Sequence, residues 1–376
     1  DNSKNSSFSL VLGVTDTNLT SHATIAEGAN ITGKNINIQA LGNNYNHVST
    51  KSTNSTDGKL MAMLSLNFTE SDVKTEVNGN LTAAGEEITS QKDLNDRLSG
   101  GIGVLTRLDS DDLAQVVAGI GGTVTDAKEK DIDDDKAKSA KDMIIDFFQK
   151  NYQQKTEKAE KDKKNDSGAK KNLQIAAACS CSKVDNDVNT IIGSTADLKS
   201  GLDLNVKSEL VETAQTQTRS WIEGDSKEGE PPVKPSTAIS AAVSIGLYDN
   251  SAATTFAGQS DAKGGTVISS SVSYPFLLEP FKDLSAGTFK DGLNLKDSLG
   301  QNLDFAKDVL GLMEEMINSW TISTASGETT GVAGAVTYLE YNNNAATNIK
   351  NTARINQRVN DVRYWSDDQT VAIDAA

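Results

Sequence analysis

Few residues of this 376-residue chain have the types and spacing that chemistry requires. The sequence contains two histidines, His22 and His47, and two cysteines, Cys179 and Cys181. A Ser-His-Asp triad or a metal-histidine site would need one of these histidines buried beside suitable partners. No phosphate-binding glycine loop, HExxH, GxSxG or CxxC pattern supplies such partners. We therefore expect no enzymatic activity and no cofactor or metal site.

The cysteine pair has the spacing of neighbours on one face of a strand. A disulfide between Cys179 and Cys181 would strain that strand. A redox or metal pair is the alternative, but it would need CxxC-like spacing and further Cys or His ligands. We expect both residues to act as small buried side chains in place of Ala or Val.

Two polar patterns invite a functional interpretation. The acids of KEKDIDDDKAK lack the glycine and glutamate spacing of a calcium loop, so a solvated approach to a helix is favoured over calcium binding. Asn-x-Ser/Thr triplets are either glycan acceptors or a product of Asn-rich turns beside Thr-rich strands. Those in the first repeat units begin at Asn5, Asn18, Asn30, Asn54, Asn67 and Asn80.

Aromatic residues gather late in the chain, at Tyr248, Tyr274, Trp320, Tyr338, Tyr341, Tyr364 and Trp365. They predict either a sugar- or protein-binding patch on the flank of the molecule or ordinary packing. Because Tyr364 and Trp365 are adjacent, one of them would face outwards in a strand. The two residues are therefore a candidate partner-binding position.

The elements that would position these residues form an interrupted repeat. Five apolar-alternating strands, each followed by Asn-, Thr-, Ser- or Asp-rich turns, begin near Leu10, Leu60, Leu173, Ile239 and Val332. Strands that recur with the same punctuation stack on one another. The repeat predicts an all-β solenoid, a right-handed parallel β-helix, with the alternating faces that begin at Leu10 and Leu60 pointing inwards.

Two segments of different composition interrupt the repeat. We expect β-helix rungs at 1–107, 172–279 and 321–376, and helical insertions at 108–171 and 280–320. The first insertion would begin a helix at Asp109 or Ser110. A second helix in it presents an apolar stripe as a candidate partner-binding surface, formed by Ile144, Phe147, Phe148 and Tyr152. A stripe ending at Trp320 marks the second insertion.

Composition and charge limit the partners. Only 36% of the residues are hydrophobic and 5% aromatic, which favours a thin, elongated core. A net charge of −16 should repel nucleic acid and anionic lipid. No apolar run is long enough to insert into a membrane. The chain starts within a strand pattern and stops as another begins, so we expect it to be a fragment of a longer protein.

The first repeat unit resembles the filamentous adhesins that Gram-negative bacteria secrete by type V pathways, in particular leukotoxin-like filamentous adhesins. The matching residues are Asp16, Asn18, Ala23, Ile25, Ala29, Ile31, Asn35, Ile36, Ile38 and Ala40. The resemblance covers about half of the chain. It implies an extracellular location at the bacterial surface or in the medium, attachment to a cell-surface protein or glycan of a host or neighbouring cell, and possible cytotoxicity. It transfers no catalytic residues.

A carbohydrate-active β-helix enzyme, a polysaccharide lyase or hydrolase, is the alternative class. Such an enzyme would need acids and bases of neighbouring rungs to converge on one outward strand face. Most outward positions of the expected rungs are Ser, Thr, Asn or Ala. We therefore expect no such alignment.

Overall fold

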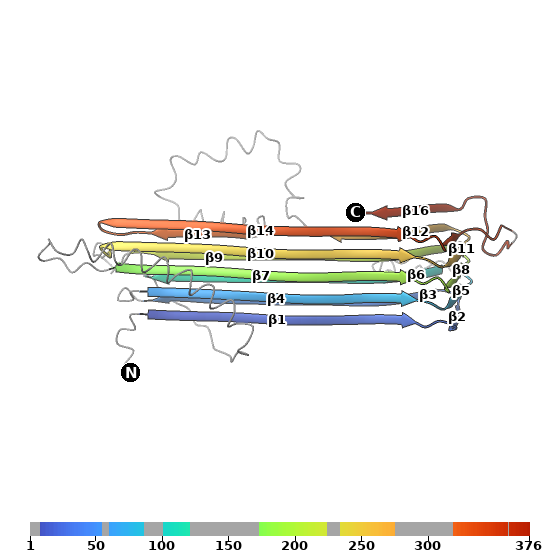
Figure 1. The fold of residues 1–376 in the computed structure, drawn as a ribbon, viewed down its shortest axis with the longest axis horizontal. Coiled ribbons are helices and arrows are strands. Elements are labelled where there is room, and N and C mark those ends of the chain that lie inside the picture. The colour runs from blue at the N-terminus through green and yellow to red at the C-terminus, as the bar shows by residue number, and fades with distance from the viewer. Residues whose placement is uncertain are drawn as a thin grey trace, which may run out of the picture.

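The structure, a computed structural model, describes residues 8–54, 60–85, 101–120, 173–223, 234–274, 319–359 and 361–376. These residues form three parallel sheets wound into one flattened solenoid (Figure 1). A rung consists of a long strand in sheet A, a short strand in sheet B and a long strand in sheet C. The predicted all-β solenoid is confirmed.

Sheets A and C are the two broad faces, and sheet B is the narrow edge that joins them. Sheet A contains β1 (Phe8–Ile25), β4 (Leu60–Val77), β7 (Leu173–Ile192), β10 (Thr237–Phe256) and β14 (Thr330–Ile349). Sheet B contains β2 (Asn30–Gly33), β5 (Asn80–Ala83), β8 (Asp197–Ser200), β11 (Gln259–Ala262) and β15 (Arg354–Ile355). Sheet C contains β3 (Ile36–Asn54), β6 (Gly101–Ile120), β9 (Asp203–Ile222), β12 (Gly265–Ser273), β13 (Ser319–Ala325) and β16 (Thr370–Ala375).

The five predicted repeat strands are the five strands of sheet A. Leu60 pairs with Ile175, Ile175 with Ile239, and Ile239 with Val332. In Figure 1 these strands lie parallel from β1 to β14 along the solenoid. Each strand between two others satisfies its backbone groups on both edges, which explains why small and polar residues suffice to build it.

The two long interruptions do not disturb this register. β10 pairs with β14 along its whole length, although residues 275–318 lie between them in the sequence. β12 and β13 both pair with β9, with Ser273 beside Val211 and Ser319 beside Thr216. The second interruption therefore leaves and rejoins the solenoid within one strand of sheet C.

The helix expected to begin at Asp109 or Ser110 is wrong, because residues 108–120 belong to strand β6. Every second side chain from Leu108 to Ile120 is buried, which is the period of a strand. The run of acids that suggested a helix start instead divides between the two faces, with Asp112 inside and Asp111 outside. At the other insertion, Ser319 and Trp320 begin β13. The remaining parts of both insertions, 121–171 and 280–318, lie outside the described residues.

The predicted orientation of the first two strands is also wrong. Met61 and Met63 form a core cluster with residues of sheet C, so they face inwards. Leu64 and Leu66 have the opposite parity and form a separate cluster within sheet A. Both faces of β4 are apolar in this stretch, and alternation alone does not say which face is inside.

Hydroxyl side chains tie sheets A and C together at one level of the solenoid. The threonine ladder comprises the register partners Thr75, Thr190, Thr254 and Thr347 of sheet A. Thr75 Oγ1 donates to the Leu105 carbonyl of sheet C at 3.0 Å, and Thr190 Oγ1 donates to the Lys207 carbonyl at 2.7 Å. The interior is thus held by repeated hydrogen bonds as well as by apolar packing.

Candidate functional site

Five carboxylates align on the outward face of sheet A, and we call them the acidic ladder. Glu70 of β4, Asp185 of β7 and Asp249 of β10 are register partners on successive rungs. Asp72 and Asp187 form a second column two residues further along the strands. Neighbouring strands lie about 4.8 Å apart, so the expectation that outward acids would not align is wrong.

The acidic ladder contains one carboxyl group that differs from the rest. Burial raises the pKa of Asp187, and the negative charges of Asp72 and Asp185 raise it further. His22 from the first rung reaches the edge of the ladder, where its Nε2 lies 2.9 Å from Asp72 Oδ2. Within the described part of the chain, no three His, Cys, Asp or Glu side chains are grouped so that they could hold a metal ion.

His47 lies on the opposite face of the molecule. Its Nε2 is 3.0 Å from Asp111 Oδ1, and its ring packs against Tyr45 with centroids 3.8 Å apart. His22 is therefore a half-exposed, and His47 a partly buried, partner of an acid on the next rung.

A second concentration of acids lies between sheets A and C. Asp112 of β6 and Glu212 of β9 are both fully buried. Asp112 accepts hydrogen bonds from Asn67 at 3.2 Å, from Thr69, and from Ser110 at 2.7 Å. These donors come from sheet A and from its own strand, so the carboxylate bridges the two broad sheets.

Glu212 has fewer donors than Asp112. Asn186 Nδ2 donates to Glu212 Oε2 at 2.7 Å, and Glu212 Oε1 has no hydrogen-bond partner. Burial raises the pKa of Glu212 well above its usual range, and the charge of Asp112 adds to the shift. Burial also raises the pKa of Asp112 itself. Two carboxyl groups inside one narrow core are an unusual feature for a chain with few chemical motifs.

Next to Asp112 and Glu212, asparagine and tyrosine side chains of successive rungs form a column along the solenoid axis. Asn186 donates to Asn250 Oδ1 at 3.0 Å, and Asn250 donates to Asn343 Oδ1 at 3.0 Å. On the neighbouring positions, the rings of Tyr248 and Tyr341 stack with centroids 4.8 Å apart. Tyr248 packs inside the solenoid, and Tyr341 stacks on it from the exposed edge strand β14.

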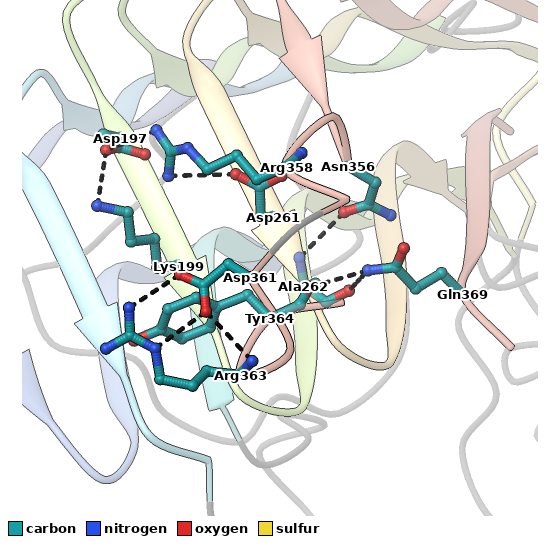
Figure 2. A network of polar contacts seen from close by, with 10 residues as sticks. All are labelled: Asp197, Lys199, Asp261, Ala262, Asn356, Arg358, Asp361, Arg363, Tyr364 and Gln369. Carbon is teal, nitrogen blue, oxygen red and sulfur yellow. Dashed lines mark hydrogen bonds and ion pairs between the residues drawn. The ribbon is translucent and has the colours of Figure 1, made fainter. Parts of the chain in front are cut away.

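The predicted partner-binding pair Tyr364–Trp365 lies in a turn and not in a strand. Figure 2 shows Tyr364 within a polar network that fastens the segment after β15 to sheet B. Tyr364 is only 7% exposed, and its carbonyl accepts a hydrogen bond from Gln369 Nε2 at 3.0 Å. Trp365 is half-buried. Tyr364 is therefore turned into this corner, whereas Trp365 remains partly accessible.

The other predicted positions have different outcomes. Ile144, Phe147, Phe148, Tyr152 and the acids at 131–135 lie outside the described residues. Cys179 and Cys181 are free thiols, and Cys179 packs with Leu64 and Leu66, which agrees with the packing interpretation. Burial raises the pKa of Cys179 to about 12, which disfavours the reactive thiolate form.

One of the sequon asparagines cannot carry a glycan in the folded protein. Asn67 is completely buried, and its side-chain amide donates to Asp112 and Ser182. This triplet therefore reflects the polar ladder of the interior. The compositional interpretation is correct at Asn67.

Sequence reasoning missed the buried acid pair and the acidic ladder. If residues 101–120 are interpreted as a strand, alternation places Asp112 on the same face as Leu108 and Val116. Prediction of the acidic ladder would have required the register of three strands that are far apart in the sequence. Among the described residues, no helix is long and apolar enough to cross a membrane. Searches of protein-family models, curated proteins and solved structures found no match to this chain.

Proposed function

We propose that this chain is part of a secreted filamentous adhesin of the type V kind, in which a right-handed β-helical shaft presents inserted segments to a cell-surface protein or glycan. The observation that supports the proposal is the unbroken register of β10 and β14 across the interruption at 275–318. A scaffold that accepts long excursions without losing its stacking is suited to display.

The connection between β6 and β7 provides the first test. The equivalent connection between β3 and β4 needs only residues 55–59, so residues 121–172 can be replaced by a Gly/Ser loop of similar length. This exchange leaves all of β6 and β7 in place. We expect the shortened protein to keep its β circular-dichroism signal and to lose attachment to cells, matrix proteins or glycans that bind the whole chain.

A matched control uses an interruption at a different corner. Residues 84–100 separate β5 from β6, whereas the equivalent step from β8 to β9 takes only Gly201 and Leu202. Deleting 86–100, which leaves Ala84 and Gly85 as a two-residue connection, should leave attachment unchanged. If the variant lacking 121–172 bound as well as the whole chain, the attachment site would belong either to the other long interruption, 275–318, or to the outer faces of the solenoid.

The acidic ladder favours one second candidate, a carbohydrate-active enzyme. Glycoside hydrolysis requires one protonated and one ionised carboxyl group on the same face of the protein. Asp187, whose pKa is raised by burial, and its register neighbour Asp72 place two carboxyl groups side by side on the outward face of sheet A.

A panel of polysaccharides assayed for new reducing ends tests the second candidate. If the chain is a hydrolase, Asp187→Asn should abolish product formation, whereas Asp374→Asn on the exposed strand β16 should not. Absence of product from the unmodified chain on every polysaccharide would remove this candidate and leave the adhesin proposal.

A further inference from the structure

The strand register brings five oxygen-bearing side chains to one place between sheets A and C. Ser71 of β4 pairs with Asn186 of β7, and Ser110 of β6 pairs with Glu212 of β9. The hydrogen bond from Asn186 to Glu212 sets these two register pairs opposite each other. Asp112 joins the group through the hydrogen bond that it accepts from Ser110. We call these five residues the oxygen cage.

Three oxygens of the cage lack a hydrogen-bond partner: Ser71 Oγ, Asn186 Oδ1 and Glu212 Oε1. The three residues are 2%, 1% and 0% exposed, respectively. Asn186 already uses its amide nitrogen as the donor to Glu212 and Asn250, so its oxygen remains as a free ligand. Unpaired buried oxygens are costly, and three in one place indicate a missing positive or hydrogen-donating group.

The types of ligand atom in the cage indicate which group is missing. All the unpaired atoms are oxygens, and none of the five side chains offers sulfur or imidazole nitrogen. Two carboxyl groups supply up to two negative charges, which a proton on Glu212 would only partly offset. A hard divalent cation neutralises both charges and can be coordinated by several oxygens at once. Calcium accepts six to eight oxygen ligands in a flexible geometry, whereas magnesium demands a regular octahedron.

We propose that the oxygen cage binds one calcium ion between sheets A and C. Glu212 and Asp112 supply the charge, and Asn186 Oδ1, Ser71 Oγ and Ser110 Oγ are the neutral ligands. The ion joins the second rung of the solenoid to the third, because Ser71, Ser110 and Asp112 belong to one and Asn186 and Glu212 to the other. This site is independent of the proposed adhesive function.

Thermal unfolding of the whole chain in calcium chloride and in EDTA tests the site. We expect calcium to raise Tm by several degrees, because it binds the folded state and not the unfolded one. Glu212→Gln keeps the size of the side chain but removes its charge, and it should abolish this rise. Glu209→Gln is the matched control on the same strand, on its outward face, and should keep the rise.

Calcium could also raise Tm by binding to the surface acids, and the control variants separate that case. A chain with Glu70→Gln, Asp185→Asn and Asp249→Asn lacks one column of the acidic ladder and should still respond to calcium. If Glu212→Gln responded to calcium as strongly as the unmodified chain, the interior site would be refuted.

Native mass spectrometry gives a measurement that does not need the variant to fold. The unmodified chain, refolded with calcium and exchanged into a volatile buffer, should retain one calcium ion per chain. A chain that retains none after refolding in calcium contradicts the proposal.

Discussion

Arg358 is the residue that most directly fastens the segment after β15 to the solenoid. Its guanidinium lies 3.0 Å from Asp197 Oδ2 of β8 and 3.2 Å from Asp261 Oδ2 of β11 (Figure 2). Its backbone N–H also donates to Asp261 Oδ1 at 3.0 Å. Asp261 is almost fully buried, and among the described residues Arg358 is the cation that pairs with it.

Replacing Arg358 by Met should leave Asp261 as a buried, unpaired carboxylate. We expect the free energy of unfolding to fall by roughly 3 kcal/mol, because removing one partner of a buried ion pair exposes the desolvation cost of the other. Urea unfolding followed by circular dichroism measures the change. Arg363→Met is the control, since the Arg363–Asp361 pair is exposed, and it should leave the midpoint nearly unchanged. Equal effects of the two substitutions would contradict this account.

At the scale of elements, the threonine ladder is the contact that repeats from rung to rung. Thr190 of β7 contacts both the Lys207 carbonyl and Thr106 Oγ1 of sheet C at 2.7 Å. Thr254 of β10 makes the same pair of contacts with the Ser269 carbonyl and Ser208 Oγ. A hydroxyl group at this position therefore bonds sheet A to sheet C on the second, third and fourth rungs, whereas the first rung has Ala23 here.

Thr190→Val keeps the shape of the side chain and removes the hydroxyl group. We expect a loss of about 1–3 kcal/mol in the free energy of unfolding, since buried polar groups of sheet C lose their partner. Thr24→Val, at an exposed position of β1, is the matched control and should change the stability little. A Thr190→Val chain as stable as the unmodified protein in urea would show that the ladder contributes only shape.

At the scale of the whole molecule, β14 is the outermost strand of sheet A among the described residues. Its inward-facing side chains are therefore not covered by another described rung. Leu339 pairs with Gly246 and is 36% exposed, and Tyr341 pairs with Tyr248 and is also exposed. A long parallel edge with apolar side chains is a template for pairing with another chain.

We expect the chain to associate as its concentration rises, in a manner that depends on this edge. Leu339→Lys places a charge on the inward face of the edge strand and should shift light scattering towards the monomer. Tyr338→Lys, on the outward face of the same strand, should have a much smaller effect. Association that is equally reduced by both variants would assign it to the outer face.

The sequence alone determined the positions of the repeat strands and the class of fold. Apolar alternation and turn residues are local properties, and they place the starts of β1, β4, β7, β10 and β14 without knowledge of their neighbours. The same pattern predicted that Cys179 is a packing residue, but not that it packs with Leu64 and Leu66 on the face turned away from sheet C. The prediction of a helix starting at Asp109 or Ser110 was wrong because acids near Ser110 imitate a helix start. The buried side chains of this stretch in fact recur at every second residue, as in a strand.

Only the tertiary structure decided which face of each strand is inside and which residues meet across rungs. The side chains of β4 are apolar on both faces, so their direction depends on the opposite sheet. Asp112 and Glu212 come together because β6 and β9 are neighbours in sheet C, although about a hundred residues separate them in the sequence. Parallel stacking converts such distant positions into adjacent ones, and no local pattern carries that information.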